Sequence, residues 1–136
     1  MNTSKTIKKM STIKEILPIL EEMAPLAYAE DFDNVGLIIG NENSEATGIL
    51  VCHDALENVI DEAIAKNCNL VVCFHPILFS GIKKITGKNY VERALLKAIK
   101  NDIAIYAVHT ALDNHPEGVN KIFCDTLGRL CQTSGS

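Results

Sequence analysis

One short run of residues limits the folds open to this chain more than any other feature. Residues 70–74 read Leu-Val-Val-Cys-Phe, so an extended strand here is apolar on both of its faces. Strands of this kind are typical of a parallel sheet that helices cover on both sides. The composition permits such a buried sheet, because 47% of the 136 residues are hydrophobic and 22% are charged. We therefore expect an α/β fold with a mostly parallel sheet and helices on both faces.

Strand and helix patterns alternate on either side of this run. Short apolar runs bounded by turn residues predict further strands, and amphipathic spacing predicts helices between them. The expected strands are 36–40, 49–53 and 103–108, and the expected helices begin at residues 12, 55, 89 and 116. The alternation predicts right-handed crossovers and a single domain over residues 11–130. Residues 1–10 are expected to form a disordered tail and residues 131–136 a flexible C-terminus.

Several residues carry specific expectations about the ends of these helices. Thr12 and Glu15 resemble a capping box, in which each residue bonds the backbone of the other. Pro18 removes a backbone donor and is expected to kink or shorten the first helix. Asp54 precedes an amphipathic segment and fits the N-cap of the next helix. Gly128 is expected to end the last helix.

Charge, hydropathy and the cysteine pattern argue against several classes of partner. The net charge of −4 and the pI of about 5.5 argue against nucleic acid, which normally requires a basic surface. No window of about 18 apolar residues exists, so no membrane span is expected. The five cysteines include no C-x-x-C pair, which favours a protein of the reducing cytoplasm over a disulfide framework. Cys52 and Cys73 lie in apolar runs and are interpreted as small core residues.

Ligand-type side chains collect where the predicted strands end. His53, His75 and His109 each follow one of these strands, and Asp113 lies four residues after His109 in what is expected to be the same loop. The carboxyl ends of parallel strands share one edge of a sheet, where ligands bind in open α/β folds. Imidazole and carboxylate groups are the usual ligands of Zn²⁺, Mn²⁺ or Fe²⁺. The sequence therefore predicts a divalent-metal site built from His75, Asp113 and His109.

Several of these positions also have a purely structural interpretation. A histidine at a strand end often only bonds the backbone, and His53 fits a side chain that points to solvent. His115 lies at a predicted helix start and fits a structural role. Asp33 and Asn34 fit turn formers.

Four segments, taken in order, resemble one known family. They are Phe32-Asp-Asn-Val-Gly-Leu37, Leu70-Val-Val-Cys-Phe-His-Pro76, Tyr106-Ala-Val-His-Thr-Ala-Leu-Asp113 and Gly118-Val-Asn120. Together they resemble the Nif-three-like dinuclear-metal-centre family, also called type 2 GTP cyclohydrolase I homologues, over about residues 11–130. The resemblance implies an oligomeric protein that opens the ring of a nucleotide-like small molecule hydrolytically, with metal-activated water.

Carried over by position, the resemblance makes His75 and Asp113 metal ligands and places His109 close to the metal. Two departures limit what this chain can hold. Phe74 stands where the family has a further ligand histidine, and the chain reaches Ser136 without the family's C-terminal ligand histidine and glutamate. We therefore expect the N-terminal half of a family member, a homo-oligomer that holds at most one divalent ion. It is either a metal-dependent hydrolase with an incomplete site or a catalytically inactive module that oligomerises or binds.

Overall fold

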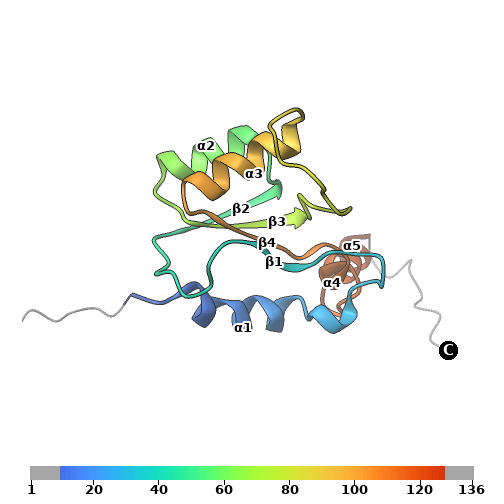
Figure 1. Cartoon of the computed structure of the whole chain (residues 1–136). Helices are drawn as coiled ribbons and strands as arrows, with labels where there is room; N and C mark the ends of the chain where they lie inside the picture. The colour runs from blue at the N-terminus through green and yellow to red at the C-terminus, as the bar shows by residue number, and fades with distance from the viewer. Residues whose placement is uncertain (1–9, 128–136) are drawn as a thin grey trace, which may run out of the picture.

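The computed structural model describes residues 10–127, and its centre is a four-stranded sheet in the order β1-β4-β3-β2 (Figure 1). The strands are β1 Gly36–Ile39, β2 Ile49–Asp54, β3 Leu70–His75 and β4 Ala104–Ala107. Strands β2, β3 and β4 run parallel to one another, whereas β1 pairs antiparallel with β4 at one edge. The prediction of a mostly parallel sheet is confirmed.

Helices lie on both faces of this sheet, as predicted. They are α1 Ile13–Met23, the short 3-10 helix η1 Leu26–Tyr28, α2 Glu57–Ala65, α3 Tyr90–Lys100, α4 His109–Asp113 and α5 Val119–Leu127. Helices α2 and α3 cover one face, and α1 lies across the other (Figure 1). Within residues 10–127, every helix is too short or too polar to cross a membrane.

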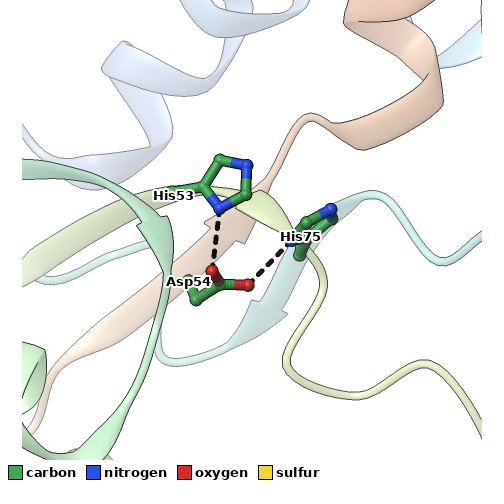
Figure 2. Close-up of side chains that lie close together, drawn as sticks. All are labelled: His53, Asp54 and His75. Carbon is green, nitrogen blue, oxygen red and sulfur yellow. Dashed lines mark hydrogen bonds and ion pairs between the residues drawn. The ribbon is translucent and has the colours of Figure 1, made fainter.

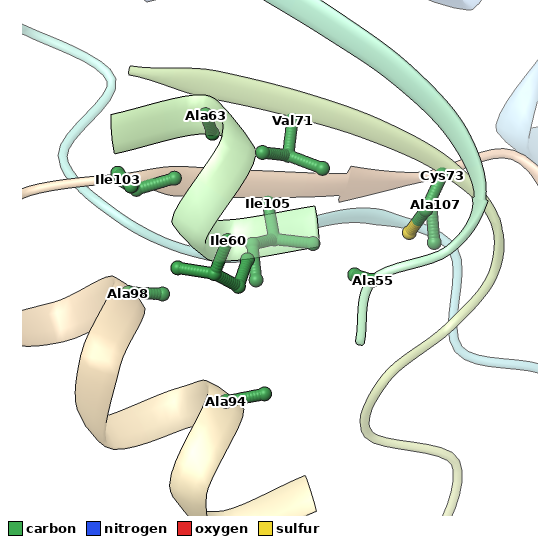
Figure 3. Packing of buried hydrophobic residues seen from close by; sticks show 10 residues of the cluster. All are labelled: Ala55, Ile60, Ala63, Val71, Cys73, Ala94, Ala98, Ile103, Ile105 and Ala107. Carbon is green, nitrogen blue, oxygen red and sulfur yellow. The ribbon is translucent and has the colours of Figure 1, made fainter. Parts of the chain in front are cut away.

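Strand β3 shows why an uninterrupted apolar run needs a helical layer on each side. Val71 and Cys73 pack with Ile60 in the cluster beneath α2 and α3 (Figure 3). Leu70 and Val72 pack in a second cluster, against α1. Successive side chains of a strand point to opposite faces. The run is therefore buried only because both faces of the sheet are covered.

Helix α1 begins as the capping-box pattern predicts but does not end at its proline. The Glu15 carboxylate accepts a hydrogen bond from the backbone N–H of Thr12 at 2.9 Å. The helix then continues through Pro18 to Met23, so it is not shortened there, and the alternative of a kink at Pro18 stays a prediction. Pro18 lacks the N–H that would bond the carbonyl of Lys14. Both residues are exposed, so water can solvate that carbonyl.

Two elements near the strand ends differ from the prediction. Asp54 is the last residue of β2 rather than an N-cap, and α2 begins at Glu57 after Leu56. The expected loop after β4 is instead the short helix α4, which carries both His109 and Asp113. The residues that were expected to be ligands therefore sit on a strand end and a helix, which fixes their backbone positions.

The connection between α4 and α5 depends on a glycine. A Cβ atom at Gly118 would lie 2.0 Å from the carbonyl oxygen of Leu112, so only glycine allows this close approach. Helix α5 starts directly afterwards at Val119, three residues later than expected from Pro116. Gly128, most of the expected N-terminal tail and residues 131–136 lie outside the described residues.

Candidate metal centre

Three parallel strands bring histidines to one edge of the sheet. β2 ends in His53 and Asp54, β3 ends in His75, and His109 opens α4 just beyond β4. In the strand register Asp54 lies opposite His75. The ring centroid of His75 is 4.5 Å from that of His53 and 5.2 Å from that of His109. The three imidazoles therefore form one cluster at the carboxyl ends of the strands, where α/β folds bind ligands.

Asp54 is bonded to two of these rings at once (Figure 2). Its Oδ2 atom lies 2.8 Å from His53 Nδ1, and its Oδ1 atom lies 2.7 Å from His75 Nδ1. Hydrogen bonds from His53 and then His75 lower the pKa of Asp54, so its carboxylate stays ionised. An ionised carboxylate only accepts hydrogen bonds. Both rings therefore donate from Nδ1.

Asp33 plays the same part for His109. Its side chain is 0% exposed, and its Oδ1 atom lies 2.9 Å from His109 Nδ1. Its Oδ2 atom accepts from the Thr110 backbone N–H at 3.1 Å and from the Thr110 hydroxyl. Burial raises the pKa of Asp33, but the hydrogen bonds from His109 and Thr110 outweigh it and lower the pKa. Asp33 is thus more than the turn former that the sequence suggested.

The bonds to Asp54 and Asp33 engage the Nδ1 atom of each of the three rings and so leave the Nε2 atom as the one that can bind a metal. With Nδ1 protonated and bonded to a carboxylate, a neutral imidazole presents its lone pair at Nε2. An ion about 2.0–2.1 Å from two such atoms, with about 90–110° between them, places the ring centroids about 4.5–5.2 Å apart. The spacings between His53 and His75 and between His75 and His109 match this range. The centroid spacing of each of these two pairs is therefore compatible with two ligands of one divalent ion.

The group that lies closest together contains two residues that the sequence did not select as ligands. Within residues 10–127, His53, Asp54 and His75 are the ligand-type side chains that offer one donor atom each within 4.8 Å of one another. The side chain of His53 is 68% exposed, as expected of a solvent-facing residue, yet its Nδ1 is bound. Asp54 had been interpreted as a helix cap, which is wrong, because its carboxylate bonds the two rings.

Asp113 lies outside this group. It ends α4, and its backbone carbonyl accepts a hydrogen bond at 3.1 Å from the side chain of Asn120. The contact joins two segments that carry the family resemblance, 106–113 and 118–120. A site shared by Asp113 with His75 and His109 stays a prediction.

Within residues 10–127, no cysteine belongs to the group of ligand-type side chains that lie together. Burial raises the pKa of the Cys52 thiol to about 11 and that of Cys73 to about 12, so both stay protonated at neutral pH. Cys73 is 1% exposed and packs in the core, as predicted. The chemistry of the site therefore rests on imidazole and carboxylate groups.

Phe74 lies among the histidines without being able to bind a metal. Its ring stacks on that of His53, with centroids 5.5 Å apart and an interplanar angle of 16°. It meets the ring of His109 edge-on, with centroids 5.4 Å apart. The ring of Phe74 therefore packs against both His53 and His109.

Comparison with known proteins places these features in a family. The profile of Duf34/NIF3 (NGG1p interacting factor 3) matches residues 11–133. The chain belongs to the Duf34/NIF3 family. Its relatives include the "GTP cyclohydrolase 1 type 2 homolog" of Clostridium acetobutylicum, 40% identical over 116 residues, which are 85% of this chain and 43% of that protein. The protein of the same name from Bacillus subtilis is 40% identical over 114 residues, which are 84% of this chain and 31% of that protein.

Two solved structures share the fold. A Bacillus cereus protein related to NIF3 superposes with a TM-score of 0.82 and 38% identity, over 88% of this chain and 33% of that chain. HcgD from Methanocaldococcus jannaschii superposes with a TM-score of 0.79 and 30% identity, over 86% of this chain and 47% of that chain. The resemblance read from the four sequence segments is thus confirmed. The chain spans less than half the length of each of these four relatives.

Proposed function

We propose that this chain is the metal-binding part of a divalent-metal-dependent hydrolase. His75 and His109 supply imidazole ligands, and Asp113 supplies a carboxylate, to one Zn²⁺, Mn²⁺ or Fe²⁺ ion. One observation carries the proposal: the Nδ1 atoms of His75 and His109 are each bonded to a carboxylate, Asp54 or Asp33, which leaves Nε2 free. Histidines that bind a metal usually donate their other ring N–H to a group such as these carboxylates.

The chain's own residues orient the ligands rather than make or break bonds. Asp54 and Asp33 hold His75 and His109 in the tautomer that ligation requires, and two donors from Thr110 fix Asp33 in turn. A divalent ion in such a site supplies an acidified water for hydrolysis. His75 lies at the end of β3 and His109 at the start of α4, with their ring centroids 5.2 Å apart.

A flat, nucleotide-like small molecule is the proposed substrate. Phe32 and Phe79 are 66% and 52% exposed, with ring centroids 6.2 Å apart. Phe79 lies 6.4 Å from the ring of His109. An open cavity of about 530 Å³, lined by residues 76–82 and 89–92, begins where β3 ends. Exposed aromatic faces of this kind suit the stacking of a heterocycle, and the relatives' name, "GTP cyclohydrolase 1 type 2 homolog", agrees with that substrate class.

Metal uptake tests the proposal directly. The purified chain is incubated with excess Zn²⁺ or Mn²⁺, desalted, and analysed for bound metal by mass spectrometry. We expect about one ion per chain and strongly reduced uptake by His75→Ala. His115→Ala is the matched control, because His115 lies outside the cluster and its Nδ1 accepts from the Glu117 backbone N–H at 3.1 Å. An inactive module without a metal site would show no uptake, and equal uptake by His75→Ala would refute the proposed ligand.

A further inference from the structure

His53 is the one imidazole of the cluster that the proposed site does not use. We propose that His53 is a metal ligand of this chain, joined to His75 through the Nε2 atoms of both rings, with Asp54 as the positioning residue that holds them. This inference rests on the proposed function for the presence of an ion. It adds a ligand that the sequence motifs do not mark.

The contacts of Asp54 give the first argument. One carboxylate binds Nδ1 of His53 through one oxygen and Nδ1 of His75 through the other, at 2.8 and 2.7 Å. Figure 2 shows the second nitrogen of each ring on the side away from Asp54. A single acidic side chain therefore sets the tautomer of two neighbouring imidazoles, and their two lone pairs are left available together.

The spacing of the two rings gives the second argument. Their centroids are 4.5 Å apart and their planes are 74° from parallel. Two imidazoles that bind one ion at about 90° have centroids about 4.5 Å apart. The rings meet edge to face, so they are not simply stacked on each other. The side chains of His53, Asp54 and His75 are 68%, 45% and 44% exposed, so an ion can reach them from solvent.

The strand register gives the third argument and suggests a sharp test. Cys52 pairs with Cys73 and Asp54 pairs with His75, so His53 and Phe74 lie side by side on adjacent strands. Neighbouring strands are about 4.8 Å apart. Position 74 is therefore the position on β3 that lies directly beside His53, and an imidazole placed there leaves its strand on the same face of the sheet as His53 does. The chain has phenylalanine there, and that ring packs flat against His53.

A ligand swap across the two strands tests the inference. Co²⁺ affinity is measured by visible absorption for the wild type, His53→Leu, the double variant His53→Leu/Phe74→His, and the control His115→Leu. We expect His53→Leu to lose at least about tenfold in affinity, and the double variant to recover most of that loss, because the imidazole returns one strand away. The control is expected to bind like the wild type. Unchanged affinity in His53→Leu, or no recovery in the double variant, would overturn the inference.

Imidazole ¹⁵N NMR gives a readout that does not depend on affinity. On addition of Zn²⁺ to the wild type, the Nε2 resonances of His53 and His75 are expected to shift while their Nδ1 atoms stay protonated. A His53 ring whose Nε2 resonance does not move would also overturn the inference.

The same experiments separate this inference from the proposed function. Loss of metal in His75→Ala with normal binding in His53→Leu leaves the metal site standing and removes only His53. Absence of metal binding in the wild type removes both. Loss in His53→Leu and His75→Ala but not in His109→Ala would keep His53 and remove His109 from the site.

Discussion

Replacing Asp33 by alanine is expected to lower the free energy of unfolding by about 3–5 kcal/mol. The buried carboxylate accepts hydrogen bonds from His109, from Asn34, and from both the backbone and the hydroxyl of Thr110. A hydrogen bond to a charged group contributes about 1.5–3 kcal/mol, and a buried donor left without a partner costs about 1–3 kcal/mol. Asn34 is exposed, so in the variant water can accept the hydrogen bond from its backbone N–H in place of Asp33. The lost hydrogen bonds from the backbone and hydroxyl of Thr110 therefore account for most of the lost stability.

Urea unfolding followed by circular dichroism measures this loss. Asp31→Ala is the matched control, because Asp31 is an exposed acid two residues away and its removal is expected to change stability by less than about 0.5 kcal/mol. The Zn²⁺ affinity of Asp33→Ala is expected to fall about 10–100-fold, because His109 loses the group that orients it. A stability loss below about 1 kcal/mol would show that the carboxylate does not hold α4 in place.

The lowered pKa of Asp33 predicts how the stability of the fold changes in acid. Burial raises the pKa of Asp33, but the hydrogen bonds from His109 and Thr110 lower it further, so the folded value lies below the ordinary 3.8. The contribution of Asp33 to stability is therefore complete above 3.8 and is lost as the pH falls through the lower, folded value. Asp33→Asn does not titrate and is expected to lose less stability over this interval. Equal acid sensitivity of the wild type and Asp33→Asn in urea titrations would contradict this account.

Three further variants test the scaffold of the site. Gly118→Ala is expected to lower the free energy of unfolding in urea by at least about 1–3 kcal/mol, because its Cβ would lie 2.0 Å from a carbonyl oxygen of α4. Gly81→Ala is the control and is expected to leave the stability unchanged, because its Cβ would meet no atom within 4 Å. Ile60→Ala leaves a cavity at a fully buried position and is expected to lower the free energy of unfolding by about 2–5 kcal/mol. Ile64 is 41% exposed, so Ile64→Ala is expected to lower it by less than about 1 kcal/mol. Phe123 on α5 is 62% exposed, and we expect the wild-type chain to self-associate in sedimentation velocity experiments. Phe123→Glu is expected to shift the chain towards the monomer, and a monomeric wild type would contradict this expectation.

The fold could be predicted because its strands and helices are marked by local patterns. The run at 70–74 is apolar on both faces, and the structure buries alternate residues of it in two separate clusters. Asn89, which the sequence placed at a helix start, accepts a hydrogen bond from the backbone N–H of Glu92 at 2.9 Å. Helix α4 was missed because it has only five residues, too few for a periodic pattern to appear.

The carboxylates of the site could not be predicted in the same way. An aspartate between a strand and an amphipathic segment suits an N-cap, and the same residue suits a partner for a histidine on the next strand. For Asp54 the decision depends on pairing with His75, which is 21 residues away in sequence. For Asp33 it depends on His109, which is 76 residues away. Local spacing carries no information about either contact.

The two carboxylates of the cluster also differ in their exposure to water. The side chain of Asp33 is 0% exposed and bonds one ring, so its bond to His109 is little screened by water or salt. Asp54 is 45% exposed and divides its two oxygens between His53 and His75, so its bonds are weaker and easier to rearrange. The proposed ion would therefore meet one imidazole that is held firmly, His109, and two that can adjust their angle, His53 and His75.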